Sequence, residues 1–134
     1  MTITKYLSYK PPKYFSPDGK DSPVFEYLLA LLASNLSLGK KALSMLKDLN
    51  NLVYLNHHIE YFRHGKFRCY ELRVRHKNDI CRFFFIAEEP HFIVFHGFTK
   101  KTEKTEERDI AQGIKNLQSY LYSKNAIDLA FPTA

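Results

Sequence analysis

Arginine and lysine side chains gather in one stretch of the sequence, between Tyr61 and Arg82. This stretch contains seven basic residues and only two acidic ones, Glu71 and Asp79. The basic residues are Arg63, Lys66, Arg68, Arg73, Arg75, Lys77 and Arg82. Guanidinium groups bind phosphate through two parallel hydrogen bonds, and an arginine beside phenylalanine on a sheet suits stacked bases as well. The pattern therefore predicts a phosphate-binding surface, with a solvated sheet face and ordinary ion pairs as the alternative.

Strands must position these side chains, because the residues alternate with a period of two. In "KFRCYELRVRHK" the apolar residues point to one face and the charged residues to the other. The turn "HKND", centred on Asn78 and Asp79, leads to "ICRFFFIAEE", a strand that is apolar on both faces except at Arg82. After "EEPH" comes a third strand, "FIVFHGF". Short turns between successive strands predict an antiparallel meander.

Helical patterns flank the meander. Ser22 suits an N-cap and Pro23 the first helical position, and the apolar stripe of that helix is Val24, Tyr27, Leu28, Leu31 and Leu32. A second helix is expected from about Ser37 to Leu49, which completes a helical hairpin, and a last helix from about Thr105 to Asn125. Residues 3–9 are expected to form a short strand, the rest of 1–21 a Pro-rich arm, and 125–134 an unassigned tail. The order predicts one α+β domain over 1–134, with the helices on one face of the sheet.

Composition supports a single folded domain with an anionic partner. The chain has 134 residues, 45% of them hydrophobic, with a formal charge of +6 and a pI of about 9.3, which favours nucleic acid or an acidic protein surface. The two cysteines show neither a CxxC nor a zinc spacing, so we expect buried free thiols. The histidines are too scattered for a metal site, and no cofactor is expected. The first residues lack the apolar core of a signal peptide, and no apolar run could span a bilayer, so a cytoplasmic protein without a membrane partner is expected.

One long stretch of the sequence resembles the phage-derived, HigB-like branch of the RelE/ParE superfamily. The members of that branch are toxins of type II toxin–antitoxin systems. The stretch is residues 70–110, "YELRVRHKNDICRFFFIAEEPHFIVFHGFTKKTEKTEERDI". That family has an aromatic-Glu-Leu-Arg strand, a short turn, an apolar strand with Tyr-Arg and then "HGF.KK..KTP..EI". Cys81-Arg82 stands here in place of Tyr-Arg, and Glu106 replaces the proline. The helix start "DSPVFEYLLAL" matches as well, so the resemblance covers about residues 20–122 and is weakest at "NNLVYLNHHIEYF".

The resemblance implies a small antiparallel sheet backed by the N-terminal helical hairpin, with a basic concave face and a C-terminal helix. It implies a metal-independent mRNA endoribonuclease that acts on translating ribosomes, and a cognate antitoxin protein as partner. RNA can be cut without a metal because its 2′-OH attacks the adjacent phosphate, while the enzyme moves protons and stabilises the added charge. The implied phosphate-binding and transition-state residues are Arg73, Arg75, Arg82 and Lys101. Further RNA contacts are expected from Lys77, Lys100, Lys104 and Arg68.

Two residues are candidates for the acid or base. Glu71 shares a face with Arg73 and is either a base or an ion-pair partner. His96 has an ordinary pKa near neutrality, but a regular strand would place it on the face opposite Lys101. Only a bulge or twist near Gly97 would let both reach one phosphate, and a packed, hydrogen-bonded histidine is the other interpretation.

Two further functions remain open at the level of the sequence. A ParE-like toxin of the same fold would poison DNA gyrase through protein contacts and leave mRNA intact. A decayed phage-derived module would bind RNA or protein without cutting, with the Pro-rich arm and the tail as interaction segments.

Overall fold

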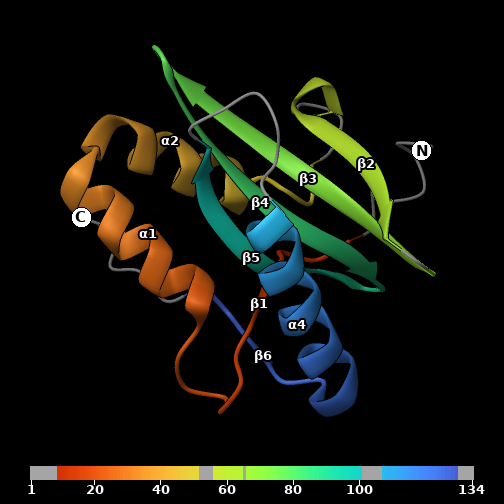
Figure 1. Ribbon diagram of the computed structural model, residues 1–134. Coiled ribbons are helices and arrows are strands. Elements are labelled where there is room, and N and C mark those ends of the chain that lie inside the picture. The colour runs from red at the N-terminus through yellow and green to blue at the C-terminus, as the bar shows by residue number, and fades with distance from the viewer. Residues whose placement is uncertain (1–8, 52–55, 65, 101–106, 130–134) are drawn as a thin grey trace.

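The sheet at the centre of the chain is six-stranded and mostly antiparallel (Figure 1). The computed structural model describes residues 9–51, 56–64, 66–100 and 107–129. Within them the elements are β1 (Lys13–Phe15), α1 (Pro23–Ser34), α2 (Leu36–Lys47), the 3₁₀ turn η2 (Asn56–His58), β2 (Ile59–His64), β3 (Phe67–His76), β4 (Asp79–Glu88), β5 (His91–Lys100), α4 (Glu107–Ser123) and β6 (Ala126–Ile127). The strand order is β2-β3-β4-β5-β1-β6, and β1 is parallel to β5.

The helical hairpin of α1 and α2 forms as its caps predict. The Ser22 hydroxyl accepts a hydrogen bond from the backbone N–H of Phe25 at 3.4 Å. Asn35 ends α1 and also begins α2, where its side-chain oxygen accepts from the N–H of Leu38 at 3.2 Å. The turn between the helices is therefore a single residue. A Cβ at Gly39 would lie 3.0 Å from the Leu32 backbone, so glycine allows the two helices to approach closely.

Helices cover both faces of the sheet, which corrects the expectation that they share one face. The hairpin packs on one side, over a core that includes Leu28, Leu46, Leu72 and Phe83. On the other side α4 packs over β4 and β5, and the second core is Phe15, Cys69, Phe84, Ile86, Ile93, Phe95, Phe98, Leu117 and Tyr120. The continuous burial of β4 from Cys81 to Ile86, on both of its faces, is what accommodates two layers. As a result α4 covers part of the face expected to be open (Figure 1).

Three short strands were not predicted at their observed places. Residues 3–9 lie mostly outside the described residues, and the N-terminal strand is β1 inside the Pro-rich arm. β6 lies in the tail, and β2 precedes the meander as its edge strand. β1 and β6 are too short to show a period, and their places come from pairing with β5 and with each other. The β3–β4 turn is Lys77–Asn78, because His76 pairs with Asp79.

Candidate active site

Charged and aromatic residues form two rows across the sheet face that carries α4. Strand pairing places Glu60 opposite Glu71, Glu71 opposite Phe84, and Phe84 opposite His96. The next row on the same face contains Arg73, Arg82 and Phe98. Neighbouring strands lie about 4.8 Å apart, so each row brings residues distant in sequence within reach of one another. One row thus contains the carboxylates and the histidine, and the other contains the arginines.

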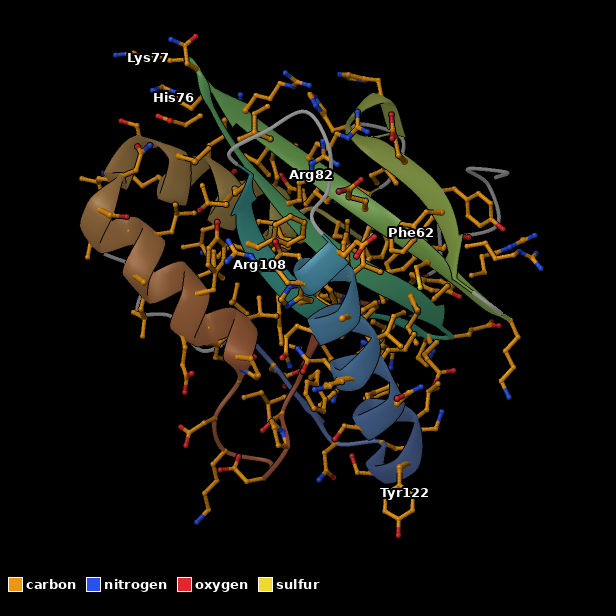
Figure 2. All side chains as sticks on the ribbon, in the orientation of Figure 1. Phe62, His76, Lys77, Arg82, Arg108 and Tyr122 are labelled. Atoms are coloured by element: carbon orange, nitrogen blue, oxygen red, sulfur yellow. The ribbon has the colours of Figure 1, made fainter. Side chains whose placement is uncertain are left out.

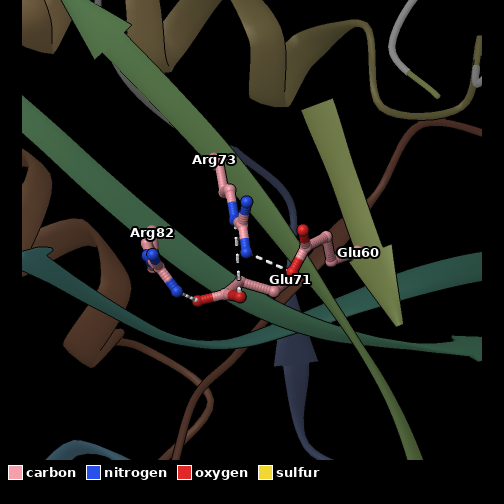
Figure 3. A network of polar contacts seen from close by, with 4 residues as sticks. All are labelled: Glu60, Glu71, Arg73 and Arg82. Carbon is pink, nitrogen blue, oxygen red and sulfur yellow. Dashed lines mark hydrogen bonds and ion pairs between the residues drawn. The ribbon is translucent and has the colours of Figure 1, made fainter. Parts of the chain in front are cut away.

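Four of these side chains form a continuous ionic network (Figure 3). Arg82 Nη1 donates to Glu71 Oε1 at 2.7 Å, and both residues are buried, with 4% and 5% of their surface exposed. Arg73 Nε lies 3.8 Å from the other Glu71 oxygen, and Arg73 Nη2 donates to the Glu60 carboxylate. Burial of a charge is tolerated when it is paired in this way. This pairing explains the arginine amid apolar residues, and Glu71 is the ion-pair partner that the sequence left as one of two possibilities.

Exposure of the arginines rises from the centre of the sheet outward. The Arg82 side chain is 5% exposed, that of Arg73 26%, and Arg75 is exposed. Arg73 and Arg75 share the face expected of them, since Glu71 in the same strand lies there too. Arg73 and Arg75 are therefore the more accessible of the three arginines, whereas Arg82 is paired with Glu71 inside the protein.

A β-bulge decides the position of His96. The register between β4 and β5 shifts between Phe84 and Phe85, so Phe95 is the extra residue. Phe95 and His96 therefore both contact Phe84 on the α4 side. The bulge precedes His96 instead of lying at Gly97, and it brings His96 onto the face of Arg82.

His96 is packed and hydrogen-bonded there. Its ring stacks on Phe98 with centroids 5.3 Å apart, and Nε2 lies 3.4 Å from Asp109 Oδ1 at the start of α4. Burial lowers the pKa of His96 below its ordinary value, and the contact with Asp109 opposes that shift. The imidazole is therefore mainly neutral at pH 7, with a carboxylate to orient it.

Two of the other predicted residues, Lys77 and Arg68, lie away from these rows. Lys101 and Lys104 lie outside the described residues, and Lys100 is the last residue of β5, where its backbone pairs with Ile80. Lys77 is exposed at the β3–β4 turn, at the far tip of the sheet from α4 (Figure 2).

Arg68 lies on the opposite face of β3. Its guanidinium is 5.1 Å from the centre of the Tyr61 ring, and Tyr61 contacts Tyr70 on the hairpin side. Strand alternation thus separates Arg68 from Arg73, although both belong to the same basic stretch of sequence.

Sequence reasoning missed Glu60 and Asp109. Glu60 belongs to β2, whose six residues "IEYFRH" show only a short alternation of charged and aromatic side chains. Asp109 is one of two acids in the first turn of α4, which is also where helices favour acids in general. Neither signal indicates a partner on another element, and tertiary packing supplies that partner.

The described residues contain no group of three or more His, Cys, Asp or Glu side chains that could hold a metal ion. Both cysteines are free and buried. Among the helices of the described part of the chain, none is long and apolar enough to cross a membrane.

Comparison with protein families identifies the family of this chain. The family described as "Phage derived protein Gp49-like (DUF891)" matches residues 31–118, more than half of the chain. The chain belongs to the phage-derived Gp49-like family. The family lies in the RelE-like, toxin-like group of phage-derived proteins, which agrees with the resemblance at that coarser level. No curated protein and no solved structure matches the chain.

The Gp49-like match spans the whole ionic network together with His96 and Asp109. It begins near the end of α1 and ends within α4, so β1 and β6 lie outside it. The residues of the candidate site thus all lie within the stretch that matches the family.

Proposed function

We propose that this Gp49-like protein is the toxin of a type II toxin–antitoxin system, of the HigB-like branch, and that it is a metal-independent, ribosome-dependent mRNA endoribonuclease. The observation that carries the proposal is the Arg73–Glu71–Arg82 network beside the His96–Asp109 pair, on one face of the sheet. Metal-free cleavage of RNA requires cationic groups that bind the phosphate and a group that exchanges protons, and this arrangement contains arginines and a histidine suited to these roles.

In this mechanism Arg73 and Arg75 bind the scissile phosphate and stabilise the charge that develops on it. Arg82 is a positioning residue, because it is buried and acts through Glu71. His96 is the proposed acid or base. This role requires the neutral tautomer whose Nε2–H donates to Asp109, because Nδ1 is then left to accept a proton from the 2′-OH.

The cognate partner in this proposal is an antitoxin protein with an acidic segment, since the chain has a formal charge of +6. Raised ionic strength is then expected to slow the association of toxin and antitoxin. Ribosomes and mRNA are the other proposed partners, and the proposed compartment is the cytoplasm.

The test is an in vitro translation reaction with a defined mRNA, in which 5′ ends are mapped by primer extension. Arg73→Ala is compared with Arg63→Ala, since Arg63 is an exposed arginine of β2 that donates to Tyr61 on the opposite face of the sheet. We expect cuts that need ribosomes, disappear in Arg73→Ala and persist in Arg63→Ala. Free mRNA without ribosomes is the second control.

Intact mRNA with continuing translation would refute the nuclease. A supercoiling assay with DNA gyrase then distinguishes the ParE-like alternative from a module that only binds.

A further inference from the structure

Arg73 lies between two carboxylates that differ in their exposure to solvent. On its inner side Glu71 is buried and also accepts from Arg82. On its outer side the Glu60 side chain is 56% exposed and comes from β2, the edge strand of the sheet. Glu60 is thus the anion that can leave the guanidinium at little cost, because water solvates it at once and an exposed ion pair contributes little.

The charges of the network also indicate what could replace Glu60. Two arginines and two glutamates make the group of four neutral overall. When Glu60 swings away, the other three residues of the group carry a net charge of +1. A phosphodiester carries one negative charge and offers two oxygens to a guanidinium, as a carboxylate does.

We propose that Glu60 is a built-in competitor that covers the phosphate-binding edge of Arg73 and that a backbone phosphate of RNA displaces it. The inference rests on the proposed function for the identity of the displacing anion. Glu60 then raises the concentration of RNA needed for binding and weakens the capture of isolated phosphates. Substrates that engage several sites at once overcome this competition.

The first test measures access to Arg73 without any RNA. Phenylglyoxal modifies accessible guanidinium groups, and mass spectrometry of peptides gives the rate at each arginine. We expect Glu60→Gln to raise the modification rate of Arg73 severalfold relative to exposed Arg75 in the same sample. An unchanged Arg73 rate would overturn the inference.

The second test measures binding of a fluorescein-labelled 2′-O-methyl RNA, which lacks the attacking hydroxyl and stays intact. Glu60→Gln is expected to tighten binding roughly two- to fivefold, the range set by the release of a part-exposed ion pair. The matched control is Glu88→Gln, which makes the same change of charge at an exposed pair with Lys124. Glu88 lies six positions beyond Arg82 in β4, about 20 Å along the strand.

Equal effects of the two substitutions would mean that only net charge matters and would overturn the inference. Weaker binding by Glu60→Gln would also overturn it, because Glu60 would then orient Arg73 for RNA. If none of the three proteins binds RNA, the proposed function fails, while the Arg73 modification rate still decides whether Glu60 covers the guanidinium. Urea midpoints of all three proteins confirm that each is folded.

Discussion

The buried pair of Glu71 and Arg82 allows a sharp prediction about stability. Arg82→Met removes the cation and leaves the Glu71 carboxylate buried, with Arg73 Nε 3.8 Å away as its remaining close cation. Removal of one member of a buried pair costs about 3–5 kcal/mol. Because Arg73 compensates in part, we expect about 3 kcal/mol, a large part of the roughly 5–15 kcal/mol that stabilises a domain.

The assay is urea unfolding at pH 7, followed by circular dichroism. With a denaturant dependence of about 1–3 kcal/mol per molar, the midpoint should fall by roughly 1–3 M. Glu71→Leu should destabilise similarly, because it leaves Arg82 buried without this carboxylate. Combining Glu71→Leu with Arg82→Met should recover at least about 2 kcal/mol relative to the sum of the single changes, since an apolar pair needs no charge compensation.

The control is Arg75→Met, at an exposed arginine of the same strand face, with an expected change within about 0.5 kcal/mol. An Arg82→Met midpoint equal to that of the wild type would refute the reasoning, because Glu71 would then not depend on Arg82. The prediction also bears on function. Lost activity in an Arg82 variant indicates catalysis only after correction for the folded fraction, whereas Arg73 and Arg75 are more exposed and give a cleaner test.

Three further predictions concern His96, α4 and the thiols. Burial lowers the pKa of His96 in the folded protein, so the unfolded chain binds the proton more readily. The contribution of His96 to the free energy of unfolding is therefore fully present above about pH 6.5 and is lost as the pH falls through the pKa of the folded state. His96→Gln should flatten the dependence of stability on pH in this range. Asp109→Asn should lower the His96 pKa further in an NMR titration, because the Asp109 carboxylate raises that pKa; a higher His96 pKa in this variant would contradict the contact. Gly113→Ala should destabilise the protein by about 1–3 kcal/mol in thermal or urea unfolding, because the new Cβ would lie 2.8 Å from the Phe84 ring. This loss should exceed the gain from the higher helix propensity of alanine. A stabilised variant would show that α4 can shift outward. Burial raises the pKa of the two cysteine thiols to about 11 and about 12, so both should react with a thiol reagent only as the protein unfolds, and fast labelling of the native protein would show that the β-sheet opens.

Much of the fold follows from patterns that the sequence contains in full. Ser22 and Pro23 define the start of α1, and the alternation around Leu72 defines β3 and its two faces. These are local features, set by the backbone geometry of one helix turn or one strand, and so they can be recognised without any partner. The basic charge and the Gp49-like character of residues 31–118 are likewise properties of the sequence.

Tertiary structure alone decided how the site is built. α4 lies on the face opposite the hairpin, where Gly113 fits closely against Phe84, and a bulge in β5 brings His96 to the arginine side. Glu60 joins Arg73 only because β2 pairs with β3 in one register. Pairing, bulges and close packing join residues far apart in the chain, and no local period encodes them. The sequence by itself therefore determined which charged residues the strands display, and the packed sheet determined that Arg82 is buried against Glu71 while Arg73 stays within reach of solvent.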